Sequence, residues 1–386
     1  MKIPAEFDEI RPYEPEEVQQ ILHELIEDRQ FSRVLQGFVP WIPKGLRNGI
    51  LKLACKGIKT TTDFQHRFMY PAMKILLWKT TTKYTFSGHP LPSKEKRYTY
   101  ISNHRDIVLD SAILDVHLYK NNYPTTVEIG IGDNLLIYPW IKKLVRLNKA
   151  FTVRRGLSRK ELLQSSLLMS KYIHFTINEK KENIWIAQRE GRAKDSSDHT
   201  QEAVLKMLAM GYEGTPVEQL KHLNIVPLTI SYEYDPCDYL KAKEFLAKRD
   251  NSNFKKSKQD DLDNMKTGIL GKKGKVHYEC APCINEWLDE LKDLPKNEFF
   301  AEVARRIDKE IHKGYRLYPG NYVAANALRG GYEDKFSAAD KEKFEKYLQD
   351  RLDKIDIESK DEAYLRERIL TMYANPVFNQ EEANAQ

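Results

Sequence analysis

The chain has 386 residues, 41% of them hydrophobic and 31% charged, which is enough apolar material for a large buried core and excludes a disordered tail. The net charge of +6 points only weakly toward anionic partners such as phosphates or lipid headgroups, because values of this size are common among soluble enzymes. No stretch approaches the roughly 20 apolar residues that span a bilayer, and the first residues lack the apolar core of a signal peptide. We therefore expect a cytoplasmic protein, or one that binds peripherally to the cytoplasmic face of a membrane.

The N-terminal part of the chain is predicted to be helical. Residues 16–28 follow two prolines and carry apolar side chains at helical spacing, which is typical of a packing helix. Residues 32–62 contain no Asp or Glu, and their basic and apolar side chains alternate as in segments that lie on anionic lipid. The alternative is an amphipathic helical cap whose lysines are simply solvated. The basic members are Arg33, Lys44, Arg47, Lys52, Lys56 and Lys59, and the apolar ones are Phe38, Trp41, Ile42, Leu46, Leu51 and Leu53.

From residue 84 onward, short β-prone runs alternate with helical ones, which predicts an α/β core. Residues 241–274 are polar and rich in lysine, and we expect them to form a solvent-exposed insertion. Acidic residues are mixed among these lysines and no nucleic-acid motif accompanies them, so nucleic acid is not an expected partner. Predicted strands cover residues 83–86, 98–102, 183–188, 225–230 and 275–280, and predicted helices cover residues 107–119, 135–147 and 158–172.

The C-terminal part is predicted to be a charged helix with a frayed acidic end. Its apolar stripe consists of Phe344, Leu348, Leu352 and Ile355. The expected fold is therefore an α/β mixed sheet flanked by helices, with a helical N-terminal region and a charged C-terminal helix. We expect three parts: a helical, membrane-facing region over residues 1–82, an α/β domain over 83–330, and a charged helical extension over 331–386.

The densest chemical signal lies at residues 100–110, where an apolar strand leads through Asn103, His104, Arg105 and Asp106 into a helix that contains Asp110. Such a junction exposes side chains at the edge of a sheet, where active sites commonly lie. A His beside a carboxylate can act as a general base, because the carboxylate fixes its tautomer and stabilises the imidazolium. A structural histidine that caps the helix is the alternative.

Three weaker signals follow downstream in a fixed order. Residues 149–156 place Arg154 and Arg155 after an apolar run, and residues 184–192 place Glu190, Gly191 and Arg192 at the end of a strand. Arginine suits a phosphate because its planar fork makes two parallel charge-assisted hydrogen bonds. The last signal is a buried strand over residues 225–230 that contains a proline. Residues 130–133 superficially suggest a dinucleotide loop, but they lack the third glycine of that fingerprint.

These four elements, in this order, resemble the glycerolphosphate acyltransferase family, which is related to the 1-acylglycerol-phosphate acyltransferases. The resemblance covers about residues 84–330 and implies an acyltransferase-like catalytic domain. The first block supplies the family's catalytic His and Asp. The matching segments are Asn103-His104 for the first block, residues 151–156 for the second, Glu190-Gly191-Arg192 for the third and Val226-Pro227 for the fourth.

The sequence departs from the family pattern at two places. The family has four residues between the His and the Asp, whereas here Asp106 follows His104 after one residue and Asp110 follows it after five. Either carboxylate can therefore orient the histidine, and we favour Asp110. The third block usually has one more residue between its Gly and its Arg, so Arg192 is carried over less directly than Glu190 and Gly191.

The resemblance implies that His104 deprotonates an acceptor hydroxyl, which attacks an acyl thioester directly, with no metal or other cofactor. Arg154, Arg155 and Arg192 would hold the acceptor's phosphate, and Glu190 and Gly191 would complete the substrate site. The expected donor is acyl-CoA or acyl carrier protein, and the expected acceptor is glycerol 3-phosphate or a lysophospholipid, with the reaction at an anionic membrane surface. The competing hypothesis is a catalytically degenerate member that only binds lipid or an acyl carrier.

Overall fold

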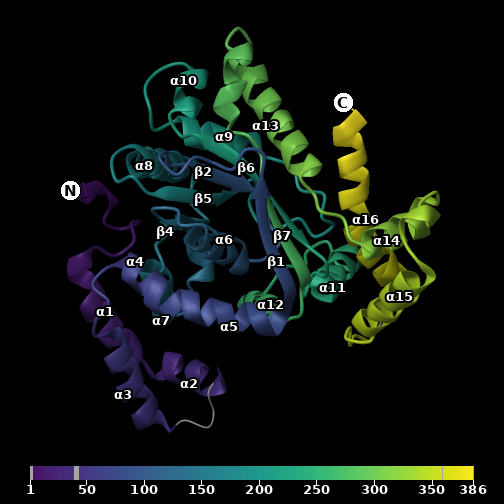
Figure 1. Ribbon diagram of the computed structural model, residues 1–386, viewed down its shortest axis with the longest axis horizontal. Coiled ribbons are helices and arrows are strands. Elements are labelled where there is room, and N and C mark those ends of the chain that lie inside the picture. The colour runs from purple at the N-terminus through teal and green to yellow at the C-terminus, as the bar shows by residue number, and fades with distance from the viewer. Residues whose placement is uncertain (1–2, 39–42, 359, 386) are drawn as a thin grey trace.

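A computed structural model describes residues 3–38, 43–358 and 360–385 (Figure 1). At its centre lies one seven-stranded sheet with the strand order β1-β7-β6-β2-β5-β3-β4. β7 runs antiparallel to β6, and the other neighbouring pairs are parallel. The predicted α/β mixed sheet flanked by helices is therefore confirmed. The strands are β1 (Thr81–Gly88), β2 (Thr99–Ser102), β3 (Val127–Gly132), β4 (Ala150–Val153), β5 (Asn183–Ala187), β6 (Ile225–Tyr232) and β7 (Gly274–Cys280).

Two strands of the sheet, β3 and β4, were not predicted. Apolar residues alternate in β3 with Glu128 and two glycines, and both of these residue types are depleted in strands, so the strand signal of the segment is weak. The buried Glu128 instead accepts a hydrogen bond from the Tyr172 hydroxyl and pairs with Lys180. These tertiary partners satisfy a carboxylate that the sequence pattern alone would place in solvent.

Helices cover both faces of the sheet (Figure 1). One face packs against α5 (Tyr70–Thr80) and α6 through a cluster that includes Leu77, Ile113 and Tyr278. The other face packs against α8, α9 and α13 through a cluster that includes Tyr172 and Ile307. The core helices are α6 (Leu109–Lys120), α7 (Pro139–Leu147), α8 (Arg159–Asn178), α9 (Glu202–Ala209), α10 (Pro216–Lys221) and α13 (Lys296–Lys313), with short turns η3 (Asp133–Leu135), η4 (Ile284–Glu286) and η5 (Leu288–Leu291).

Local signals explain where the helices begin. The helix predicted from residue 135 starts only at Pro139, because proline at the first helical position has no N–H to lose and favours that start. Ser158 caps α8 through a reciprocal pair of hydrogen bonds with Glu161, as the start predicted at residue 158 requires. α8 then runs well past its predicted end at residue 172.

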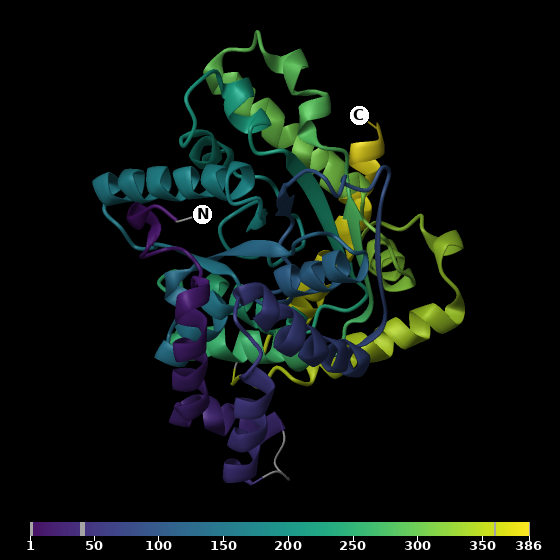
Figure 2. The same ribbon diagram turned by 60° about the vertical axis from the view of Figure 1, so that its left-hand side comes forward.

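The N-terminal region is helical, as predicted, and its first three helices project from the rest of the molecule (Figures 1 and 2). On α3, Leu46, Ile50 and Leu53 are exposed and share one helical face. In the same acid-free stretch, Trp41 and Ile42 lie outside the described residues. The elements are η1 (Ala5–Phe7), α1 (Pro15–Glu27), α2 (Arg29–Phe38), α3 (Lys44–Cys55), α4 (Thr61–Phe64), the π-helical turn η2 (Gln65–Met69) and α5 (Tyr70–Thr80).

The prediction of a solvent-exposed insertion over residues 241–274 is wrong. The segment contains most of α11 (Asp238–Asp250) and all of α12 (Lys258–Leu270), and both helices have buried positions. Lys241 and Lys273 are both almost fully buried. Burial lowers the pKa of the Lys273 ammonium to about 8, although nearby Asp106 raises it. A lysine-rich composition ordinarily indicates exposure to solvent. Here Lys241 and Lys273 are buried because they donate hydrogen bonds to acceptors inside the protein.

The frayed acidic end predicted for the C-terminus is also wrong. α16 (Glu362–Ala385) is a long helix that buries Leu365, Ile369 and Tyr373. It shares one hydrophobic cluster with α11, α14 and α15, including the predicted stripe of Phe344, Leu348, Leu352 and Ile355. The helices of the C-terminal segment therefore pack on the α/β core. The remaining elements are α14 (Pro319–Arg329), η6 (Glu333–Lys335) and α15 (Ala338–Leu352).

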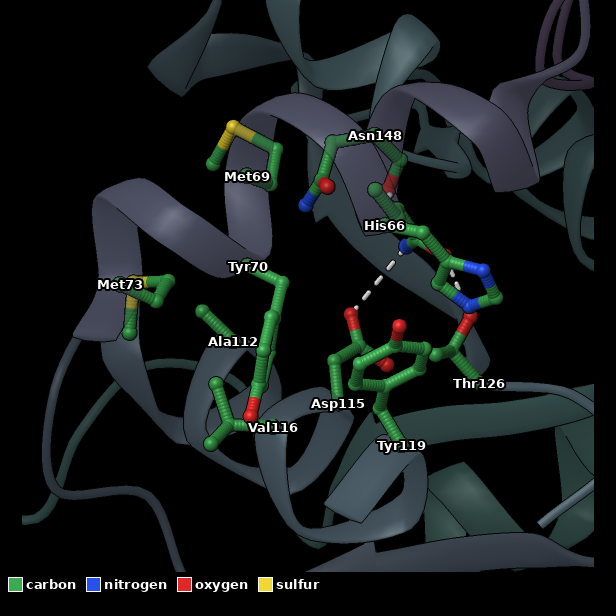
Figure 3. A pocket seen from close by; sticks show the side chains of 11 residues that line it. His66, Met69, Tyr70, Met73, Ala112, Asp115, Val116, Tyr119, Thr126 and Asn148 are labelled. Carbon is green, nitrogen blue, oxygen red and sulfur yellow. Dashed lines mark hydrogen bonds between the residues drawn. The ribbon is translucent and has the colours of Figure 1, made fainter. Parts of the chain in front are cut away.

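A small pocket lies where the N-terminal helices meet α6 (Figure 3). At its base, the Asp115 carboxylate of α6 accepts hydrogen bonds from the Gln65 side chain at 3.2 Å and from the Val127 backbone N–H at 2.9 Å. Burial raises the pKa of Asp115 to about 7, against the lowering effects of the Val127 N–H and the Lys149 charge, while Glu182 adds to the rise. The contact joins the π-helical turn to the helix that also carries Asp110.

We predict that Asp115 makes the protein less stable as the pH rises from about 4 to about 7. Its pKa is higher in the folded than in the unfolded chain, so the folded state holds the extra proton in this window and loses that advantage as the pH increases. Asp115→Asn cannot ionise. Its unfolding free energy relative to wild type should therefore grow by on the order of 2 kcal/mol between pH 5 and pH 8. Denaturant unfolding at both pH values checks this, and an unchanged difference would contradict it.

Candidate active site

The predicted site residues gather where the parallel strands end. β2, β5 and β6 are neighbours and run in the same direction, so the segments that follow them emerge at one edge of the sheet. Residues 103–106 follow β2, residues 188–192 follow β5 and residues 233–237 follow β6. Residues 154–156 follow β4, which is separated from β5 by β3.

His104 and Asp110 are in direct contact. The Nδ1 atom of the imidazole lies 2.8 Å from Oδ2 of the carboxylate, and this carboxylate is buried while the His104 side chain keeps 14% of its surface exposed. Because a carboxylate accepts, Nδ1 carries the proton and the lone pair lies on Nε2. The pair therefore has the arrangement of a general base that can take a proton from a hydroxyl at its exposed side.

Backbone groups fix the position of Asp110. The N–H of Arg105 donates to Oδ2 at 2.7 Å, and the N–H of Asp106 lies 3.0 Å from Oδ1 and 3.1 Å from Oδ2. The Tyr232 hydroxyl reaches Oδ1 at 3.5 Å. The turn after His104 thus folds back onto the first turn of α6 and holds the carboxylate against the imidazole.

Asp106 has a different task in the structure. Its Oδ1 accepts hydrogen bonds from the backbone N–H groups of Val108 and Leu109 at 2.9 and 2.8 Å, so it caps the start of α6. Burial and then the neighbouring Asp110 charge raise the pKa of Asp106, against these two hydrogen bonds. Of the two carboxylates left open by the sequence, the structure places Asp110 beside the histidine.

Two further side chains hold the histidine segment in place. Asn103 exchanges hydrogen bonds with the backbone of Ile230 on β6, at 3.0 Å as donor and 2.8 Å as acceptor. The Trp185 ring meets the His104 ring edge-on at 5.8 Å between centroids and donates to the Ser102 hydroxyl. Sequence reasoning missed Trp185, because its contact with His104 depends on the pairing of β2 with β5.

The structure brings Arg155 and Glu190 together at the sheet edge. Arg155 Nη1 lies 3.0 Å from Glu190 Oε1, and both side chains are exposed to solvent. Arg154 is also exposed and pairs with Glu9 of the N-terminal region. Gly191 has φ +70°, a left-handed conformation that favours glycine at this turn. These residues form an open, charged rim.

Arg192 lies apart from this rim. Its side chain is largely buried, and Nη2 donates to Asn264 Oδ1 of α12 at 2.9 Å. Burial lowers the pKa of its guanidinium, but the nearby groups of Cys237, Asp106 and Asp235 more than offset this and raise it. α12 also approaches Asp106 through Gly268, where a Cβ atom would lie only 2.2 Å from Asp106 Oδ2.

Sequence reasoning missed Asn264 and Gly268, since it placed them in a solvated insertion. Neither residue had a signal in the sequence that could separate it from its polar neighbours. The roles of His104, Asp106, Asp110, Arg154, Arg155, Glu190, Gly191 and Arg192 in binding and catalysis stay predictions.

Part of the chain is similar to a known protein family. Residues 83–231, which include the predicted site residues from His104 to Arg192, match the family model described as Acyltransferase. This segment of the chain is therefore similar to the acyltransferase family. No curated protein matches the sequence. Among solved structures, the 1-acyl-sn-glycerophosphate (LPA) acyltransferase PlsC from Thermotoga maritima is similar, with 10% identity and a TM-score of 0.36 over 79% of this chain and 100% of that chain.

We predict that Asp110→Asn lowers the rate of acyl transfer by about 10²- to 10⁴-fold, because an amide stabilises an imidazolium poorly and favours the wrong tautomer. Asp106→Asn is the matched control. Asparagine caps a helix as well as aspartate does, so this variant should keep activity within about tenfold of wild type. Steady-state kinetics of both purified variants check this. A larger loss in Asp106→Asn would contradict the assignment of Asp110 to the histidine.

Proposed function

We propose that this acyltransferase moves a fatty acyl group from acyl-CoA or acyl carrier protein to a hydroxyl of glycerol 3-phosphate or a lysophospholipid in membrane lipid synthesis. The observation that carries the proposal is the contact between His104 and Asp110 within the segment that matches the acyltransferase family. Nε2 of His104 takes the hydroxyl proton as the acceptor oxygen bonds to the thioester carbonyl carbon. The carbon–sulfur bond then breaks, and the proton passes to the departing thiolate.

The charged rim supports a phosphate-bearing acceptor. Arg154 and Arg155 are exposed near the site edge, and each pairs with an exposed carboxylate, Glu9 and Glu190 respectively. Exposed ion pairs of this kind contribute little energy, at most about 1 kcal/mol, so a phosphate can displace the carboxylates. We assign Arg154, Arg155, Glu190 and Gly191 to acceptor binding. Arg192 lies on the less exposed side of the site. Its guanidinium donates a hydrogen bond to Asn264, and the charge of Asp106 lies nearby.

We also propose that the N-terminal helices dock the protein on the cytoplasmic face of an anionic membrane. No helix among the described residues has the length and apolar character needed to cross a bilayer. α3 carries an exposed apolar stripe of Leu46, Ile50 and Leu53, and α5 exposes Ile75 and Trp78. Apolar side chains flanked by lysines on a segment without acids suit the boundary between headgroups and acyl chains.

Purified protein should form product from a long-chain acyl thioester with at least one acceptor among glycerol 3-phosphate, lysophosphatidate and other lysophospholipids. His104→Ala should lose about 10²-fold or more of this activity, because the general base is removed. Product is measured by mass spectrometry with acyl-CoA and with acyl carrier protein as donors. Lipid binding without product from any pair of donor and acceptor would instead favour a degenerate acyltransferase that only binds lipid.

The docking proposal is tested by replacing Leu46, Ile50 and Leu53 with Ser together. The expected result is at least a tenfold weaker partition to vesicles that contain phosphatidylserine, because about 0.8 kcal/mol is lost for each CH₂ group that no longer enters the acyl layer. Tyr212→Ser with Leu328→Ser is the matched control, since these exposed apolar residues lie on other elements. Sedimentation with vesicles measures both. Equal binding by the triple variant would favour the helical-cap interpretation.

A further inference from the structure

Arg105, the residue after His104, links the catalytic pair to two distant segments of the chain. Its guanidinium is buried, and Nη1 donates to Ser196 Oγ at 2.6 Å. Nη2 lies 3.7 Å from Asp235 Oδ2. The backbone N–H of the same residue donates to Asp110 Oδ2 at 2.7 Å, the oxygen that also contacts His104. Where the Arg105 side chain is held therefore determines where one donor to Asp110 lies.

The anchors of Arg105 are themselves fixed. Ser196 is fully buried and has φ +60°, a left-handed conformation that is uncommon for a non-glycine residue and that persists only where the surroundings impose it. Asp235 lies 2.6 Å from Lys241 Nζ, and its backbone N–H donates to the Tyr373 hydroxyl of α16 at 2.9 Å. Ser196 thus lies in the loop after β5, and Asp235 lies in the loop after β6. Contacts with α11 and α16 hold the second loop in place.

Electrostatics make this position stable. Burial alone would raise the pKa of Asp235, but Lys241 and Arg105 more than offset this and hold it well below its ordinary range. Burial raises the pKa of Asp198, against the lowering effects of Arg105, Lys241, His104 and Arg189. The buried Arg105 guanidinium therefore has an opposite charge beside it in Asp235. A buried arginine paired in this way keeps one geometry, since breaking a pair leaves an uncompensated buried charge.

We propose that Arg105 is a positioning residue for acyl transfer, held by Ser196 and Asp235 so that its backbone N–H keeps Asp110 against His104. The inference rests on the proposed function and deepens it. Residues 195–198 follow the Glu190-Gly191-Arg192 segment. According to the inference, they set the geometry of the catalytic pair and do not bind the acceptor. Displacing a catalytic group by about 1 Å can cost about 10²-fold in rate. The buried Ser196 hydroxyl can therefore control turnover through the position of Arg105.

The test compares Ser196→Ala with Ser196→Gly. Both variants lose the hydroxyl, but glycine also relieves the left-handed backbone, so a purely conformational role for Ser196 predicts that the glycine variant is fully active. Our proposal predicts that both lose about tenfold or more in kcat with little change in KM, because the pair is displaced and not the substrate site. Ser170→Ala is the matched control. This serine is also fully buried, with Oγ bonded to Leu208 and Gly211 and no part in the site, so its kcat should stay at the wild-type value.

A second readout does not require activity. The proton on His104 Nδ1 is hydrogen-bonded to Asp110 and should give a downfield NMR signal, assigned by its loss in His104→Ala. The signal should shift or broaden in both Ser196 variants and stay unchanged in Ser170→Ala. An active wild type with unchanged kcat and an unchanged signal in both Ser196 variants would overturn the inference. An inactive wild type would overturn the proposed function instead, and the NMR signal would still decide whether Arg105 and Ser196 position the pair.

Arg105→Lys and Arg105→Met extend the test to the side chain itself. Lysine keeps the charge beside Asp235 but lacks the planar fork, so it should retain more kcat than methionine does. Equal activity of wild type and Arg105→Met would also overturn the inference. If Arg105→Met fails to fold, the two Ser196 variants still decide the matter, since they change no charge.

Discussion

The constraint on which the site depends is the removal of the Asp110 carboxylate from water. A carboxylate at such a position needs donors on every side, because an unpaired buried charge is far more costly than an exposed one. Here the donors are His104 Nδ1, two consecutive backbone N–H groups and the Tyr232 hydroxyl. The turn between β2 and α6 must close tightly to bring these donors to the carboxylate. The same turn places the partly exposed His104 ring at the edge of the sheet where the parallel strands end.

This constraint explains why segments far apart in the sequence converge on one place. Asn103 joins the end of β2 to β6, Asp106 starts α6, and Gly268 lets α12 approach Asp106 closely. α16 takes part through Tyr373, whose hydroxyl accepts from the Asp235 backbone. The C-terminal helices therefore brace the loop that follows β6, and their apolar faces share one hydrophobic cluster with α11 and α14.

The two kinds of arginine in the site illustrate how burial separates chemical roles. Arg154 and Arg155 lie in solvent with exchangeable partners, which suits a ligand that arrives and leaves. Arg105 is buried and Arg192 is partly buried, and side chains of other segments hold both, which suits permanent positioning. We therefore assign the exposed arginines to substrate binding and the less accessible ones to preorganisation, as proposed above.

The sequence by itself determined the α/β class, five of the seven strands and the identity of the catalytic candidates, because periodic apolar patterns and the ordered polar blocks are local signals. It narrowed the partner of His104 to Asp106 or Asp110. The tertiary structure alone decided between them, since the choice depends on how residues 104–110 fold back on themselves. The tertiary structure also decided the burial of Lys241, Lys273 and α16. Composition places lysines and acidic helices in solvent, and only partners contributed by distant segments make their burial favourable.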